Sequence, residues 1–130
     1  DATLDFRTGP DEWSIREIMA HLVDDEMFVM RTRMERMMKE EGPTLPSHDE
    51  KKWYGQRNTS RDTINELLSD FATQRAASLG ILTLLREQEW VRTAYHPEYG
   101  HFTALAWLGS WVEHDLVHIR QIEQTIEAVG

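Results

Sequence analysis

The chain has no cysteine among its 130 residues. Disulfide bonds, zinc sites built on thiolates and a cysteine nucleophile in the protein are therefore excluded. A reducing compartment is compatible with this composition, and we expect a cytoplasmic protein. No apolar run approaches the length of a membrane span, and no charged segment followed by an apolar segment opens the sequence as in a signal peptide. We expect no membrane partner.

Basic residues are also scarce: 14 lysines and arginines face 23 acidic residues, which gives a net charge of -9. Binding to phosphate backbones requires a concentrated basic surface. The most basic run, RTRMERMMK at 31–39, is interrupted by Glu35 and followed by Glu40 and Glu41. At helical spacing this run is typical of a solvated face, so we expect no nucleic-acid partner.

The alternation of polar and apolar residues that is typical of strands is absent as well, and apolar residues instead recur at three- and four-residue spacing. This periodicity predicts an all-α fold with long helices over residues 12–41, 60–88 and 103–128, in a single domain covering 1–130. The predicted apolar stripe of the first helix consists of Ile15, Ile18, Met19, Leu22, Val29, Met30 and Met37.

Helix boundaries follow from capping residues and breakers. Pro10 precedes the first helix and Gly42 ends it, whereas Ser60 is the expected N-cap of the second and Thr103 that of the third. Residues 42–60 are predicted to form a loop with one short helical turn at 50–54. Residues 94–102 are predicted to form a turn-rich loop.

The third helix has an unusually wide apolar surface. One face carries five residues within about 80° of arc: Leu105, Leu108, Val112, Leu116 and Ile119. An adjoining arc carries Trp107, Trp111, His114 and His118, so that the surface expected to be buried spans about 200°. A helix of this kind packs against more than one neighbour, as in a helical bundle.

Two histidines of this arc, His114 and His118, lie one turn apart, and His21 flanks the apolar stripe of the first helix. Facing helices of a bundle bring such side chains together, which gives a candidate three-imidazole site for zinc or a similar divalent ion. Three neutral ligands leave a coordination position open, as in catalytic sites. The alternative is a set of polar histidines at the bundle edge, hydrogen-bonded to carboxylates.

Three segments together resemble the DinB/YfiT-type family. They are EWSIREIMAHLVDDE at 12–26, YHPEYGHFT at 95–103 and WVEHDLVHIRQI at 111–122. The family pattern W-S-x-x-E-x-x-x-H-L-x-D-x-E, an H-P-x-x-G turn and a closing H-D-x-x-H all occur here in the family's order. FATQRAASLGIL at 71–82 is also similar, so the resemblance covers nearly the whole chain.

The resemblance implies a four-helix bundle in which His21, His114 and His118 hold zinc or nickel. Characterised relatives include S-transferases and isomerases that use low-molecular-weight thiols, whereas many others have no known activity. The leading hypothesis is therefore a metal-dependent transferase or hydrolase acting on a small molecule such as a thiol. A non-catalytic metal- or ligand-binding bundle is the alternative, and a helical interaction protein without metal is the third reading.

The chain departs from the family at its beginning. Members usually carry a long helix before the Trp-Ser motif, and this sequence offers only DATLDFRTGPD there and does not begin with methionine. Three helices alone would bury the wide apolar arcs poorly. We therefore expect either a homodimer or a missing N-terminal segment.

Asp24, Asp25 and Glu26 are the candidate supporting carboxylates or general base, because ligating histidines commonly donate their second N–H to such groups. Glu26 falls within the apolar arc, where it could alternatively pair with Arg75. Asp115 has two readings too, as a solvated residue or as a support for the adjacent histidine.

Pocket candidates are His96, Trp107 and Trp111. A turn-forming or exposed role is the alternative for His96 and for the nearby His101, and core packing is the alternative for the tryptophans. His48 has no context beyond a polar loop.

Overall fold

A computed structural model describes residues 2–59 and 62–130. None of the helices in these residues is both long and apolar enough to cross a bilayer. In chain order the elements are α1 (Ala2–Asp5), α2 (Ile15–Asp25), the π-helical η1 (Glu26–Arg31), α3 (Thr32–Lys39), α4 (Glu50–Gln56), α5 (Ile64–Leu84), the 3-10 turn η2 (Glu87–Glu89), β1 (Thr93–His96), β2 (Gly100–Thr103) and α6 (Ala104–Val129).

The first long helical segment is continuous but changes its hydrogen-bonding pattern midway, where η1 joins α2 to α3. It begins at Ile15 rather than at Glu12, because Ser14 caps it. The Ser14 hydroxyl accepts a hydrogen bond from the N–H of Glu17, and the Glu17 carboxylate accepts one from the N–H of Ser14. Every residue of the predicted apolar stripe is buried.

The second long helix, α5, is shorter than predicted. Thr63 caps it through a hydrogen bond to the N–H of Glu66, and the predicted cap Ser60 lies outside the described residues. The helix ends at Leu84, after which η2 forms a separate turn. The short helical turn expected near residue 50 is confirmed as α4.

The prediction of a loop without strands at 94–102 was wrong. β1 and β2 pair antiparallel, with Thr93 opposite Thr103 and His96 opposite Gly100. Each strand has four residues, too few to produce a recognisable alternation in the sequence. Gly100 has a φ of 75°, which glycine adopts without steric cost and which permits this tight reversal.

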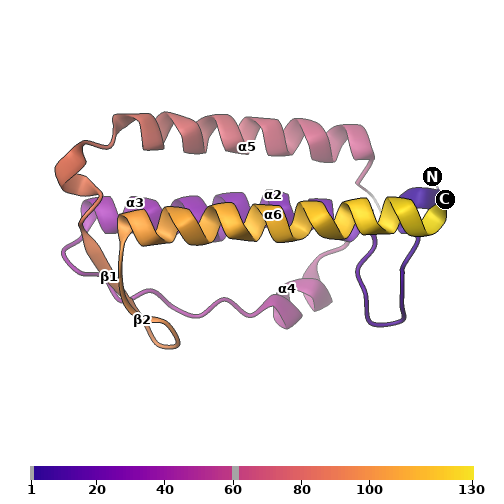
Figure 1. The fold of residues 1–130 in the computed structure, drawn as a ribbon, viewed down its shortest axis with the longest axis horizontal. Coiled ribbons are helices and arrows are strands. Elements are labelled where there is room, and N and C mark those ends of the chain that lie inside the picture. The colour runs from indigo at the N-terminus through magenta and orange to yellow at the C-terminus, as the bar shows by residue number, and fades with distance from the viewer. Residues whose placement is uncertain (1, 60–61) are drawn as a thin grey trace.

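Helices α5 and α6 pack on the continuous segment α2–η1–α3, and the hairpin lies beyond the first residues of α6 (Figure 1). Two apolar clusters form the core. The cluster near the hairpin includes Met34, Trp107 and Trp111, and the other includes Ile18 and Leu67. Between the clusters lies a belt of buried polar side chains from α2, η1 and α6, and this belt contains the candidate site.

The predicted orientation of α6 requires a correction. Leu105, Val112, Leu116 and Ile119 are 41% to 61% exposed, whereas Trp107, Trp111 and His118 of the adjoining arc are buried. The indole rings provide large apolar area in contact with α3 and η1, so they determine which side of the helix faces the core. The leucine-rich side stays uncovered, as expected when the described residues form only three long helical segments.

Candidate metal centre

The three predicted histidines converge on one point. The Nε2 atom of His21, from α2, lies 3.1 Å from Nε2 of His118 and 3.3 Å from Nε2 of His114, both from α6. His21 is fully buried, with the rings of Trp13 and Trp53 against its imidazole at centroid distances of 4.9 and 5.3 Å. The structure thus brings together the residues that the sequence nominated.

The donor set fits a divalent ion. Zn–N bonds of about 2.0–2.1 Å in tetrahedral geometry separate two ligand nitrogens by about 3.3 Å. The separations of Nε2 between His21 and its two partners match this value. A single N–H on one of the three converging nitrogens cannot donate to both of the others, so the third nitrogen needs another partner.

Asp25 completes the cluster in a way that the sequence did not predict. Its Oδ2 atom lies 3.1 Å from Nε2 of His114 and 3.3 Å from Nε2 of His21. We expected a supporting carboxylate to contact the outer nitrogen of a ligand, but this oxygen approaches the same converging nitrogens. Asp25 Oδ1 is buried and accepts no hydrogen bond from the described residues. Asp25 therefore has the position of a fourth ligand.

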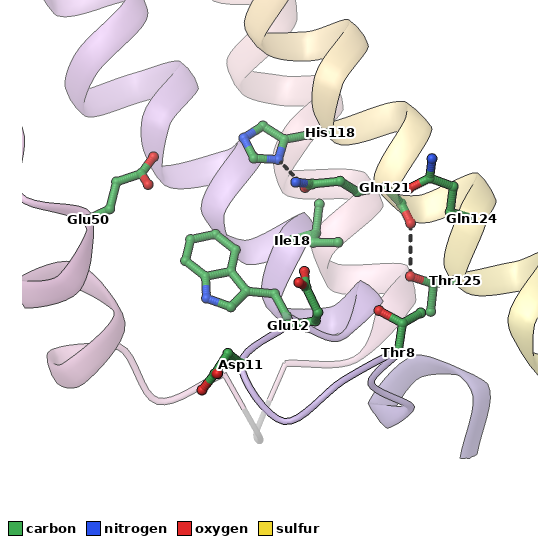
Figure 2. Close-up of a pocket in the computed structure, with 10 residues that line it drawn as sticks. Thr8, Asp11, Glu12, Ile18, Glu50, His118, Gln121, Gln124 and Thr125 are labelled. Carbon is green, nitrogen blue, oxygen red and sulfur yellow. Dashed lines mark hydrogen bonds between the residues drawn. The ribbon is translucent and has the colours of Figure 1, made fainter.

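Outer partners orient two of the three imidazoles. Nδ1 of His118 lies 2.8 Å from Oε1 of Gln121 (Figure 2), an acceptor, so that the proton sits on Nδ1 and the Nε2 lone pair points into the cluster. Nδ1 of His114 lies 3.4 Å from Oδ1 of Asp115. Asp115 thus contacts the adjacent histidine, as in the second of the two roles considered from the sequence, and is not a freely solvated residue. Nδ1 of His21 is buried without a hydrogen-bond partner among the described residues.

The cluster favours positive charge at one position. Burial lowers the pKa of His21 to about 4, and burial also lowers the pKa of His118. Burial opposes ionisation of His114 as well, but the carboxylates of Asp115 and Asp25 outweigh it and raise the pKa of His114 to about 9. The charged form is thus favoured at His114, where two carboxylates stabilise a cation, and disfavoured at His21 and His118.

The other two candidate carboxylates lie outside the cluster. Asp24 accepts a hydrogen bond of 2.6 Å from Nε1 of Trp53 and pairs with Arg57. Glu26 pairs with Arg75 through two hydrogen bonds, of 2.8 and 3.1 Å, and accepts a third from Nε1 of Trp111. The structural alternative for Glu26 is therefore confirmed. Neither carboxylate is placed to act on a ligand of the histidine cluster.

Two further groups come from the loop before α4 and from its first turn. Nε2 of His48 lies 3.4 Å from Oδ1 of Asp25, and Oε1 of Glu50 lies 3.6 Å from Nε2 of His21. Sequence reasoning missed both. No local pattern marks them, because the path of this loop is set by long-range hydrogen bonds between Tyr95 and residues 43–45.

Two of the cavities reach different histidines of the cluster. The larger, of about 840 Å³, is lined by His114 and Asp25 together with Arg33, His96 and Trp107. His96 is buried and its Nδ1 accepts a hydrogen bond from the N–H of Glu98, while Trp107 belongs to the core and also faces this cavity. Trp111 belongs to the core and does not line either of these two cavities.

The smaller cavity, of about 450 Å³, reaches His118 (Figure 2). Its charged side chains are the carboxylates of Asp11, Glu12 and Glu50. The amides of Gln121 and Gln124 add hydrogen-bonding groups, and no lysine or arginine of residues 2–59 or 62–130 lines it. This lining favours a neutral or cationic ligand with several hydroxyl or amino groups.

The chain is similar to known proteins over most or all of its length. A family model described as the DinB superfamily matches residues 1–122. The chain is 26% identical over its full length to a Bacillus subtilis protein named "Putative metal-dependent hydrolase YfiT", of which it covers 73%. It is 28% identical over 88% of its length to a "Putative metal-dependent hydrolase" from Oceanobacillus iheyensis, of which it covers 66%.

The fold is similar to a solved structure as well. YfiT from Bacillus subtilis, described as a probable metal-dependent hydrolase with an unusual four-helix bundle topology, superposes with a TM-score of 0.89 at 26% identity. The match covers the entire chain and 74% of the solved one. The expected helical-bundle fold is thereby confirmed.

Proposed function

The chain belongs to the DinB superfamily, and on that premise we propose that it is a metal-dependent enzyme that acts on a small molecule. His21, His114 and His118 would hold the divalent ion, zinc or nickel, with Asp25 as a further ligand. The observation that carries this proposal is the approach of Nε2 of His21 to Nε2 of His118 and of His114, at 3.1 and 3.3 Å, with the buried Asp25 carboxylate against His21 and His114.

When bound, the ion supplies a Lewis acid for a substrate oxygen or sulfur. The chain has no cysteine, so the nucleophile is an external water or thiol. Asp25 Oδ1 accepts no hydrogen bond from the described residues and can take the proton that this nucleophile loses. Gln121 contacts Nδ1 of His118 and so favours the tautomer that leaves Nε2 available to the ion. Asp115 contacts Nδ1 of His114 and favours the same tautomer there.

Transfer of a group between two small molecules suits the site better than hydrolysis does. The two cavities reach different histidines of one cluster, the larger at His114 and the smaller at His118. Two ligands can therefore approach different histidines of the same centre. A low-molecular-weight thiol as one of them accords with the resemblance described above.

Metal analysis of protein purified without a histidine tag and without added metal tests the binding step. We expect about one equivalent of zinc or nickel in the wild type and less than about a tenth of an equivalent in His118→Ala. His101→Ala is the matched control, because His101 is exposed and lies outside the cluster. Equal metal content in wild type and His118→Ala would remove the basis of the proposal.

A screen of thiol conjugation tests the catalytic step. Metal-loaded protein is assayed with bacillithiol, mycothiol and glutathione against electrophilic acceptors, and in parallel with ester and amide substrates. Conjugation lost in Asp25→Asn supports the transferase. Ester or amide cleavage without thiol dependence supports the hydrolase, and metal binding without either activity supports the non-catalytic alternative.

A further inference from the structure

Arg33 of α3 is a buried cation without an ionic partner. Its residue exposure is 7%, and no carboxylate of residues 2–59 or 62–130 forms an ion pair with it. The other arginines near the core differ in this respect: Arg57 pairs with Asp24 and Asp62, and Arg75 pairs with Glu26 and Asp115. Among these arginines, Arg33 alone carries a buried charge that the described side chains leave uncompensated.

Two contacts hold the guanidinium in place. Nη2 donates a hydrogen bond of 2.8 Å to the carbonyl of Pro46, and the guanidinium lies over the ring of Trp107 at 5.1 Å from its centroid. Both contacts orient the group, but neither neutralises it. Burial lowers the pKa of Arg33, and the carboxylates of Asp25 and Glu98 offset this only in part, from beyond ion-pair distance.

The guanidinium also lines the larger cavity, the one that reaches His114 and Asp25. Its remaining N–H groups have no acceptor among the described residues and are not sealed from solvent. A guanidinium with unused donors in a cavity beside a candidate metal centre has the chemistry of a ligand-binding group, since its planar fork matches a carboxylate bidentately.

We propose that Arg33 binds a carboxylate of the substrate in the larger cavity, while the reacting end of that substrate lies at the histidine cluster. This inference rests on the proposed function for the identity of the cavity as a substrate site. A single guanidinium neutralises one carboxylate. A phosphate dianion fits less well, because it concentrates two charges at one point of a cavity whose carboxylates, Asp25, Asp49, Glu50 and Glu98, outnumber its permanent cations, Arg33 and Lys51.

A purely structural role is the competing explanation. Through Pro46 the side chain ties the loop that precedes α4 to α3, and it packs on Trp107. That role predicts lower stability in a variant but no response of the guanidinium to added anions. The test therefore follows the arginine itself rather than stability.

Nitrogen-15 NMR of the arginine Nε–H groups provides this readout, with the Arg33 signal assigned by its absence from Arg33→Lys. Succinate, which carries its two charges on separate carboxylates, is titrated into metal-free and zinc-loaded protein. Succinamide is the neutral probe, and inorganic phosphate is the probe whose charges share one group. We expect a saturable shift of the Arg33 signal with succinate, with a Kd of about 1–10 mM. Succinamide should produce none, and phosphate should bind about tenfold more weakly.

Arg36→Lys is the matched control, since Arg36 lies on the same helix, pairs with exposed Glu40 and does not line the cavity. Succinate affinity should be unchanged in this variant and at least about tenfold lower in Arg33→Lys, measured by calorimetry. An Arg33 signal that does not move with succinate, or moves equally with succinamide, would overturn the proposal. A shift in metal-free protein keeps the anion site even if the metal centre fails its own test.

Discussion

Two neighbouring aspartates, Asp24 and Asp25, differ completely in their environment. Asp25 touches the converging nitrogens of His21 and His114, whereas Asp24 is held by Trp53 and Arg57 on another side of α2. Adjacent residues of a helix point about 100° apart, so one residue position separates a candidate metal ligand from a structural anchor.

The first prediction compares these two positions. Asp25→Asn removes a charged oxygen from the cluster, and we expect metal affinity to fall about 10- to 100-fold, measured by competition with a chelator of known affinity. Asp24→Asn should leave metal affinity unchanged and lower the free energy of unfolding by about 1 kcal/mol, because it weakens the pair with Arg57. Equal affinity in Asp25→Asn and wild type would place this carboxylate outside the metal centre.

The candidate metal ligands that could be predicted from the sequence lie on helices with a clear apolar periodicity. Helical spacing together with the family motif identified His21, His114 and His118, and the structure brings them together. The same argument placed Asp25 near His21 but not at the nitrogen it approaches. His48 and Arg33 were not identified, since the first lies on a loop fixed by long-range pairing and the second was grouped with a solvated face.

At the scale of elements, the N-terminus of α2 is stabilised by a capping interaction that includes a charged side chain, Glu17. Glu17 bonds to the N–H of Ser14 and pairs with Arg7 at 2.8 Å. Burial opposes its ionisation, but the hydrogen bonds from Ser14 and Tyr54 and the charge of Arg7 outweigh burial and lower the pKa of Glu17 below its usual 4.5. The Glu17 carboxylate therefore binds a proton more weakly in the folded state than in the unfolded chain.

The second prediction follows from that sign. A lowered pKa in the folded state adds stability that is present above about pH 4.5 and is lost as the pH falls below it. Glu17→Gln keeps an acceptor for the cap but not the charge, so it should cost about 1 kcal/mol at pH 7 and progressively less towards pH 3. Urea unfolding of both proteins at several pH values measures this, and a difference that stays constant down to pH 3 would contradict it.

Arg75 links three elements, because it extends from α5 to Glu26 of η1 and Asp115 of α6. The third prediction is that Arg75→Met lowers the free energy of unfolding by about 3 kcal/mol, since it leaves the buried Glu26 carboxylate without a cation. Arg36→Met is the control, with an expected cost below about 1 kcal/mol, because Arg36 pairs, among the described residues, only with exposed Glu40 of its own helical segment. Adding Glu26→Gln to Arg75→Met should recover part of the loss, and no recovery would mean that the charge of Glu26 is not the cause.

Element boundaries show where periodicity stops being informative. The first helix was predicted as one unit and is continuous, but its π-helical middle leaves the apolar spacing intact and so has no distinct pattern. The hairpin was missed because its strands are short. On α6 both adjoining arcs were expected to be buried, but only the arc with Trp107 and Trp111 faces the core, because apolar spacing does not indicate which of two adjoining faces finds a neighbour.

At the scale of the whole molecule, α6 leaves an apolar strip open to solvent, formed by Leu105, Val112, Leu116, Ile119 and Ile126. Asp115, which faces Arg75 of α5, lies beside this strip, and α5 itself exposes Leu68 and Leu79. Contiguous apolar surface of this kind is typical of interaction sites.

The fourth prediction concerns this surface. We expect the 130-residue chain to self-associate through it, so that sedimentation velocity gives a mass above that of one 15.3 kDa chain. Leu116→Glu should shift the distribution to monomer, because burying the new carboxylate is unfavourable. Ala106→Glu, at an exposed position off the strip, should not. A wild type that is monomeric at concentrations of about 100 µM would contradict the prediction.

The two indole rings packed on His21 give this site an optical property of its own. Trp13 and Trp53 lie within about one ring diameter of the imidazole, at centroid distances of 4.9 and 5.3 Å. A paramagnetic ion such as nickel at the histidine cluster would quench their fluorescence, whereas zinc, with its filled d shell, would not. The chain's intrinsic emission can thus distinguish which metal occupies it, without a label and without any assay of turnover.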